Sequence, residues 1–229
     1  MTTKKQIKHL LAPILERHTD IAAIESRMGL QCFITPLTHV NRGFMIWRTS
    51  MPDAPNYHWY LGYTFSPRAM PYGPHIEDFP IREAKTMRWS HPDHLRAFSE
   101  TLESEVLPQL RQIDSLDKLV AVGRERASML NWWWDHPIHR IRLQVAAGQF
   151  EAAGVTAREI LAENRRESRY WNERLYSEII EQLWPRVEQS DYPAIAALLH
   201  DWERQYVELN ALGSIYEKTT FPFEVGNAP

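Results

Sequence analysis

Three short segments in the first third of the chain constrain its fold most strongly. The segments LQCFITP (residues 30–36), GFMIWRT (43–49) and YHWYLGYTF (57–65) are rich in aromatic and β-branched residues, which favour strands. Pro, Asn, Gly and Asp residues separate them, as in the turns between antiparallel strands. The sequence therefore predicts a small antiparallel sheet of about three to five strands.

The segments around these strands read as helices and loops. Residues 3–17 place apolar residues at i, i+3, i+4 and i+7, the pattern of an amphipathic helix. A second short helix is expected at residues 20–27. Residues 66–80 are rich in Pro and Gly and are expected to form a long surface loop. An edge strand is expected at residues 81–89, followed by a helix with Ser90 as its N-cap.

The C-terminal half has the 3.6-residue apolar period of helices at residues 137–147, 150–164, 170–184 and 192–209. A faint internal repeat places the aromatic residues Phe150 and Tyr192 at equivalent positions, 42 residues apart. This spacing is similar to that of tetratricopeptide-like helical hairpins. We therefore predict an α+β fold, with an α+β domain at residues 1–130 and a weakly tetratricopeptide-like helical region at 131–229 packed on it.

Composition and charge exclude several classes of protein. The formal net charge is −3, so no global basic field favours nucleic acid as a partner. No apolar run approaches the about 18 residues of a membrane span, and the N-terminus does not read as a secretory signal. The single cysteine, Cys32, lies among apolar residues and is expected to be a buried reduced thiol. The sequence thus predicts a cytoplasmic protein with no membrane span.

A polar stretch directly before a predicted strand is the strongest candidate binding site. His39, Asn41 and Arg42 lie there, and an arginine offers a rigid fork of donors for a carboxylate or phosphate. Gly43 permits a tight turn or a close backbone approach. The alternative interpretation is structural, with Asn41 and Gly43 in a turn and Arg42 paired with an internal acid.

The third predicted strand adds two residues to this candidate. Alternation of side chains places His58 and Tyr60 on one face. The opposite face, which begins with Trp59 and Leu61, is expected to be buried. A pocket that includes His39, Arg42 and His58 would combine an anion-binding group with a histidine able to move protons.

Two histidine pairs have the same spacing, His91 with His94 and His136 with His139, each in the pattern H-P-x-H. Two such pairs are in principle able to supply the imidazoles of a zinc site. Each pair also lies at a predicted helix start, where proline suits the first turn, and this structural interpretation is favoured. Phosphate-binding, nucleophile-elbow and zinc-protease motifs are absent. The sequence predicts neither a metal nor a cofactor.

The segment NWWWDHP places Trp132, Trp133 and Trp134 in a row near the predicted domain boundary. On a helix three consecutive side chains fan over about 200°, and on a strand the middle one points away from its neighbours, so no single pocket face holds all three rings. We expect a seam between the two parts of the fold, with a partly exposed ring available to line a pocket.

Four segments together resemble a set of uncharacterised bacterial proteins. They are PLTHVNRGFMI, YHWYLGYTF, EVLPQLRQIDSLDKLVAV and the tail YEKTTFPFE. The shared features are a His-Val-x-Arg-Gly motif before a strand and a tail in which the resembling proteins have Thr-Pro-Phe. Here the tail reads Thr-x-Phe-Pro-Phe-Glu, with Thr220 in place of that proline. The resemblance implies an α+β N-terminal part and a helical C-terminal part. Some proteins of this kind look like immunity proteins of bacterial competition systems, which is an analogy only.

Two hypotheses on function remain open at this stage. In the first, the chain is a protein-binding module, such as an immunity-like inhibitor of a toxin or effector. It would use the loop at residues 66–80, an exposed sheet face and its acidic helices. In the second, it is a small-molecule-binding protein or enzyme with a pocket near His39, Arg42 and His58. A protein partner is expected under the first hypothesis, and the oligomeric state is left open.

Overall fold

A computed structural model describes residues 2–51, 53–67, 75–80, 84–125, 134, 136–162 and 176–225. The fold is α+β, as predicted, with an N-terminal helix, an antiparallel sheet and a helical C-terminal region. The chain divides into two compact units. The first comprises Met1–Tyr63, Met70–Asp114 and Asn210–Glu217, and the second comprises Thr64–Ala69, Ser115–Leu209 and Lys218–Pro229. The boundary predicted after residue 130 falls inside the Ser115–Leu209 stretch of the second unit.

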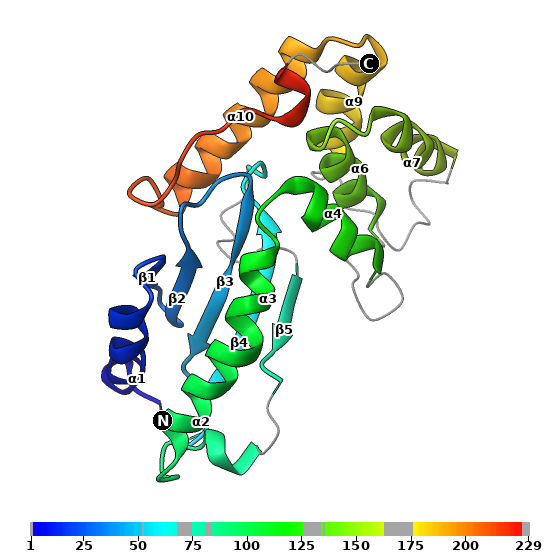
Figure 1. Ribbon diagram of the computed structural model, residues 1–229. Helices are drawn as coiled ribbons and strands as arrows, with labels where there is room; N and C mark the ends of the chain where they lie inside the picture. The colour runs from blue at the N-terminus through cyan, green and yellow to red at the C-terminus, as the bar shows by residue number, and fades with distance from the viewer. Residues whose placement is uncertain are drawn as a thin grey trace. The chain divides into compact units, whose positions relative to one another are not determined.

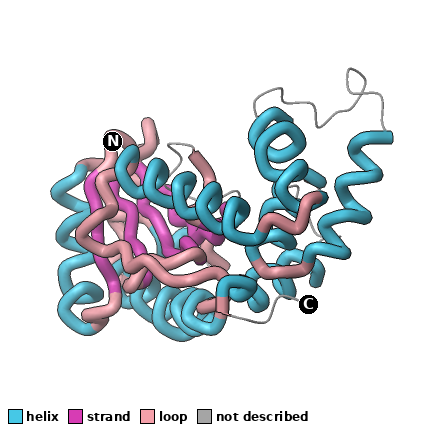
Figure 2. The backbone as a smooth tube through the Cα atoms, turned by 90° about the horizontal axis from the view of Figure 1, so that it is seen from above, coloured by secondary structure: helices cyan, strands magenta, loops and turns pink. Residues whose placement is uncertain are grey.

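The sheet of the first unit is a five-stranded antiparallel meander, in which each strand pairs with its neighbours in the chain (Figure 1). The three segments that predicted the sheet supply its three central strands. Figure 2 shows the strands side by side, in magenta. The strands are β1 (Ile21–Glu25), β2 (Gly29–Ile34), β3 (Val40–Trp47), β4 (Asn56–Tyr63) and β5 (His75–Asp78).

The predictions for the two edge strands are wrong. Residues 20–27 were expected to be helical, but Ile21–Glu25 is β1, because pairing with β2 outweighs the helical preference of the two alanines. The loop expected at residues 66–80 contains β5, which pairs with β4. Where an edge strand was expected at residues 81–89, Ala84–Met87 forms a 3₁₀ helix, and residues 81–83 lie outside the described part.

Helices cover one face of the sheet. Helix α1 (Lys4–Arg17) begins with a capping box between Thr3 and Gln6 and buries the predicted apolar face. A continuous helical segment follows later in the chain, made of α2 (His94–Thr101), the π-helical turn η2 (Leu102–Val106) and α3 (Leu107–Gln112). Ser90 is not its N-cap. Asp93 occupies that position, and the Ser90 amide donates instead to the Asp53 carboxylate at 2.8 Å.

An aromatic cluster joins the sheet to α2. The rings of Phe79 and Phe98 stack with centroids 5.9 Å apart, and Tyr57 of β4 lies 5.2 Å from Phe98. Phe44 of β3 meets Phe79 edge to face at 6.2 Å. Such pairs stabilise a core by about 0.5–1.5 kcal/mol each beyond the area that they bury. This cluster forms the core on the helix-covered side of the sheet.

The second unit is helical, as predicted for the C-terminal region. Helices α6 and α7 form a hairpin, and Gly148 in the turn between them adopts φ +74°, a conformation that favours glycine. The equivalent residues of the repeat, Phe150 and Tyr192, contact one another with ring centroids 5.0 Å apart. The elements are α4 (Leu116–Glu125), α6 (Pro137–Ala146), α7 (Phe150–Ala162), η3 (Ser177–Leu183), α9 (Trp184–Glu188), α10 (Tyr192–Leu209) and η4 (Pro222–Glu224).

A buried ion pair lies in the middle of this unit. Arg142 of α6 is fully buried, and its Nη2 lies 2.7 Å from Oε2 of Glu178, whose side chain is 6% exposed. The guanidinium also donates to the Ser66 hydroxyl at 3.2 Å and lies 5.0 Å from the centre of the Trp202 ring. A cation buried to this extent requires such compensation. Among the helices that the structure describes, none is long and apolar enough to cross a membrane.

Candidate functional site

Arg42 lies on β3 and points toward the helix-covered side of the sheet. Its Nη1 donates to the carbonyl oxygen of Ile113, just after α3, at 2.5 Å. Burial lowers the pKa of the guanidinium, while the charges of Asp114 and Asp20 act in the opposite direction. Arg42 therefore links the sheet to α3 through a backbone carbonyl, which favours its structural interpretation, although Asn41 and Gly43 lie within β3 and not in the expected turn.

His58 lies on the other face of the sheet. In the register of β3 and β4, Arg42 is opposite Leu61 and Met45 is opposite His58. Residues opposite one another share a face of the sheet, and side chains alternate along each strand. Arg42 and His58 therefore point to opposite faces. Nδ1 of His58 is 2.8 Å from Oδ1 of Asp78, and its ring packs against Trp47 at 5.0 Å. The structure thus does not bring Arg42 and His58 into one pocket.

Tyr60 and Gly43 form a tight structural contact. The fully buried Tyr60 hydroxyl crosses over Gly43 to donate to the Cys32 carbonyl at 2.9 Å. A Cβ at Gly43 would lie 2.5 Å from this hydroxyl oxygen, so only glycine fits. This confirms the close approach predicted at Gly43. His39 and Asn41 are also buried, at 7% and 0% exposure, so these polar residues lie in the interior.

Of the three consecutive tryptophans, the structure describes Trp134 alone. Trp134 is 5% exposed, and the Arg124 guanidinium lies 6.0 Å from the centre of its ring, while Trp132 and Trp133 lie outside the described residues. His136 precedes Pro137 at the start of α6, as predicted, with its ring 5.1 Å from that of His139.

In the other histidine pair, His94 belongs to the aromatic core, whereas His91 is half-buried and its Nδ1 accepts from the Asp93 N–H at 3.2 Å. His94 packs edge to face against Trp89 and shares a 2.5 Å hydrogen bond with the Tyr57 hydroxyl. Burial lowers the pKa of His94, against the charge of Asp53. Within the described ranges, no group of three or more His, Cys, Asp or Glu side chains has the geometry of a metal site.

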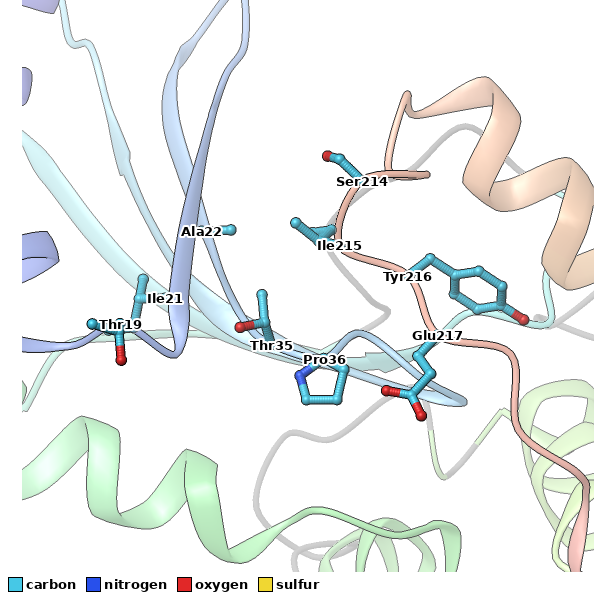
Figure 3. A pocket seen from close by; sticks show the side chains of 9 residues that line it. All are labelled: Thr19, Ile21, Ala22, Thr35, Pro36, Ser214, Ile215, Tyr216 and Glu217. Atoms are coloured by element: carbon cyan, nitrogen blue, oxygen red, sulfur yellow. The ribbon is translucent and has the colours of Figure 1, made fainter.

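An open pocket of about 650 Å³ lies where β1 begins and β2 ends (Figure 3). The returning segment around Tyr216 forms its other side, held by the bonds Leu37 N–H to Ile215 O and Glu217 N–H to Leu37 O, both 2.8 Å. Figure 3 shows the Ile215 side chain directed toward Ala22 and the Glu217 carboxylate directed toward Pro36. The lining residues are Thr19, Ile21, Ala22, Thr35, Pro36, Ser214, Ile215, Tyr216 and Glu217.

The edge strand β1 runs directly from this pocket. Two ladder bonds fix the alternation of β1: Thr35 N–H donates to Asp20 O, and Ser26 N–H donates to Gly29 O. Even-numbered residues of β1 therefore turn their backbone groups toward β2, and odd-numbered residues turn theirs outward. Ile21 satisfies its N–H on His18 O, and no backbone group of the described residues pairs with the outward groups of Ala23 and Glu25, so these two residues form a free edge within that part of the chain. This edge is able to accept a further strand.

Charge is distributed unevenly along this site. Asp20, beside the pocket, is held by two 2.8 Å bonds from Arg111. Glu25, at the far end of β1, is paired with Lys4 and Lys8. Glu217 is the one charged residue among the nine that line the pocket, and no ion pair to its carboxylate is formed by the described residues. The pocket therefore favours a cation.

Sequence reasoning missed this site for two reasons. The segment IAAIE was expected to be helical, so its free edge was not considered. The other wall comes from a turn that lies 179 positions beyond Leu37 in the chain, and no local pattern connects them. The alternation of Ile21, Ala23 and Glu25 with Ala22 and Ile24 was the one available signal, and it is weak because the two alanines by themselves favour a helix.

Comparison with protein-family models, with curated proteins and with solved structures finds no match for this chain. Its class is therefore defined by its own structure: an α+β protein with a five-stranded antiparallel meander and a helical C-terminal region.

Proposed function

We propose that this chain is a cytoplasmic protein-binding module that pairs an extended segment of a partner protein with the free edge of β1. The observation that carries the proposal is the unpaired β1 edge, which leads directly into the open pocket beside Thr35 and Glu217. Strand addition of this kind takes its affinity from backbone hydrogen bonds and its specificity from pockets for alternate side chains.

The two edges of the sheet differ in a way that favours β1. Natural edge strands are usually guarded by charges, prolines or short length. The four residues of β5 include His75, Glu77 and Asp78, so that edge carries such charges. The five residues of β1 have a single charged side chain, Glu25, at the end far from the pocket. The remaining four are alanine and isoleucine, which allow a second backbone to approach.

The pocket suggests which side chain the partner contributes. Its apolar walls, Ile21, Ile215 and Pro36, suit an aliphatic stem, and the Glu217 carboxylate suits a cationic end. Lysine and arginine combine these two properties. The partner segment is therefore proposed to carry a basic residue at the position that enters the pocket.

The bacterial resemblance suggests a toxin or effector as the class of partner, and this part of the proposal rests on that resemblance alone. The second hypothesis, a small-molecule or enzymatic pocket, requires Arg42 and His58 to converge. Because these two side chains point to opposite faces of the sheet, the geometry does not favour that hypothesis.

The test replaces Ala23 with proline. Proline is tolerated where an edge N–H points away from the sheet, so Ala23→Pro leaves the sheet intact but removes an outward donor and obstructs an added strand. Ile76→Pro on β5 is the matched control. Phe79 N–H donates to Tyr57 O of β4, and backbone groups alternate along a strand, so the Ile76 N–H points away from β4 at the opposite edge of the sheet.

Tagged full-length chains of the wild type and both variants are used to capture proteins from native cells, followed by mass spectrometry. The expected result is a partner held by the wild type and by Ile76→Pro and bound at least about tenfold more weakly by Ala23→Pro. With the purified partner added, the amides of Ala23 and Glu25 should become protected from hydrogen exchange. Equal capture by all three chains, with no new protection on β1, would refute strand addition.

A further inference from the structure

In the second unit, His200 of α10 lies between two carboxylates. Its Nδ1 is 3.0 Å from Oε2 of Glu203, and its Nε2 is 2.9 Å from Oε1 of Glu224. Glu203 belongs to the same helix and is fully buried, whereas Glu224 belongs to η4 in the C-terminal segment (Figure 1). His200 therefore connects α10 to Glu224, which lies 24 positions after His200 in the chain.

The geometry of this bridge depends on the protonation state of the ring. Ionised carboxylates only accept hydrogen bonds, and a neutral imidazole donates from one nitrogen only. Both contacts are hydrogen bonds when the ring is the doubly protonated imidazolium. In the neutral ring, one nitrogen lone pair would face a carboxylate oxygen. The arrangement of atoms thus selects the cation.

Each glutamate has a second bond that fixes its position. Oε1 of Glu203 accepts the Thr64 hydroxyl at 2.7 Å, and Oε1 of Glu224 accepts the Phe221 N–H at 2.6 Å. The same Glu224 oxygen therefore meets both the His200 ring and the Phe221 amide. This ties the local turn of the segment to the histidine.

The segment that is held in this way closes an aromatic cluster. Phe221 is fully buried and Phe223 is 5% exposed. Phe223 packs against Phe150 at 5.5 Å and Tyr192 at 6.5 Å, the two equivalent residues of the internal repeat. Phe221 meets Phe65 edge to face at 5.6 Å. Release of the segment would therefore expose a set of aromatic rings.

We infer that His200 is a pH-sensitive latch: its protonated ring holds the C-terminal segment, Phe221 to Glu224, on α10, and its deprotonation loosens that segment. Among the residues that the structure describes, Glu203 from α10 and Glu224 from η4 are the charged groups bonded to the ring. Asp201 and Arg204, its other charged neighbours on α10, pair with one another on the exposed side of the helix.

The electrostatic environment agrees with this assignment. The hydrogen bond to Glu203 raises the pKa of His200 most, burial opposes the shift, and Glu224 raises the pKa further. A histidine whose pKa is raised on folding stabilises the fold fully below its unfolded-state pKa of about 6.5. That stabilisation is lost as the pH rises through the folded-state pKa. The latch is therefore closed on the acidic side and opens toward alkaline pH.

The test measures hydrogen exchange of the Phe221, Phe223 and Glu224 amides in the full chain between about pH 6 and pH 9. Rates are expressed as protection factors, which removes the intrinsic dependence of exchange on pH. In the wild type, protection of these amides should fall by up to about tenfold per pH unit within the window. In His200→Gln the protection should be lower and independent of pH. His9→Gln, which changes an exposed histidine of α1, should match the wild type.

Two further measurements keep the test decisive if His200→Gln folds poorly. Nitrogen NMR of the wild-type ring should show both His200 nitrogens protonated at the acidic end and one proton lost within the window. Glu224→Gln keeps a carbonyl acceptor for Phe221 and should move the opening to lower pH. A neutral His200 ring at the acidic end, or wild-type protection that does not change with pH, would overturn the latch.

Discussion

The buried pair between Arg142 and Glu178 gives the sharpest prediction on stability. Replacing Glu178 with glutamine keeps the size of the side chain and an oxygen acceptor for the 2.7 Å contact, but it removes the negative charge. The guanidinium of Arg142 remains at 0% exposure, where the Ser66 hydroxyl and the face of the Trp202 ring also contact it. The substitution therefore leaves a cation in the interior without the charge of the Glu178 carboxylate.

The magnitude follows from what such a burial costs. Breaking a buried ion pair by removing one partner typically destabilises a protein by 3–5 kcal/mol, because the remaining charge is desolvated without compensation. Since the glutamine oxygen still accepts a hydrogen bond and the Trp202 ring still attracts the cation, the lower end applies. We expect Glu178→Gln to reduce the free energy of unfolding by about 3 kcal/mol.

The same helix provides a matched control. Arg140, two residues before Arg142 on α6, pairs with Glu159 at 3.1 Å, and the Glu159 side chain is 59% exposed. An exposed pair contributes about 0–1 kcal/mol, so Glu159→Gln should change stability by less than about 1 kcal/mol. Both variants remove one carboxylate from an arginine of α6, and they differ in burial.

Urea unfolding of the wild type and the two variants measures the difference. With a slope of about 2–3 kcal/mol per molar urea, Glu178→Gln should move the midpoint down by about 1 M and Glu159→Gln by no more than a few tenths. The slope itself should stay unchanged. If the two variants lose equal stability, the account of Arg142 as a cation dependent on Glu178 is wrong.

Two further predictions concern the first unit. Gly43→Ala should destabilise the fold by about 1–3 kcal/mol or more, because the new Cβ would lie 2.0 Å from the Cys32 carbonyl oxygen and 2.5 Å from the Tyr60 hydroxyl. Thermal unfolding measures this loss of stability. An unchanged midpoint of unfolding would contradict the close contact at Gly43. For Asp20, burial acts to raise the carboxyl pKa, but the hydrogen bonds and charge of Arg111 outweigh it, so the pKa is lowered. A lowered carboxyl pKa means that its stabilisation is present above the unfolded-state value and is lost as the pH falls through the folded-state value. Asp20→Asn should therefore show a flatter loss of stability than the wild type between about pH 5 and pH 2.5, and an equally steep loss would count against this linkage.

The parts of the fold that the sequence predicted depend on local patterns. Helix α10 begins and ends at the residues expected from its apolar period, Tyr192 and Leu209, because a helix is determined by neighbours three and four positions apart. The strands β2, β3 and β4 were recognised because aromatic and β-branched residues fill both faces of a central strand. Tyr60 and Leu61 are both at 0% exposure, although burial of only one face was expected.

The edge strands depend on pairing that no local pattern contains. In β1 the alanines suit either structure, and the ladder with β2 decides. The candidate site had the same difficulty. The sequence predicted a site from the ionisable and polar side chains of His39, Arg42 and His58, but the pairing of β3 with β4 places Arg42 and His58 on opposite faces of the sheet. Which residues share a face depends on the register between the two strands. That register depends on the intervening turn and cannot be read from either segment alone.

The parallel bridge between Leu37 and Tyr216 has a consequence for how this chain is made. During translation the N-terminus emerges first, and the strands β1 to β5 leave the ribosome long before residues 210–217 do. The wall of the pocket formed by Ser214 to Glu217 is added when almost the whole helical region has already been synthesised. The β1 edge therefore stands beside an unfinished pocket until residues 214–217 have been synthesised, and the pocket is not complete on a nascent chain before then.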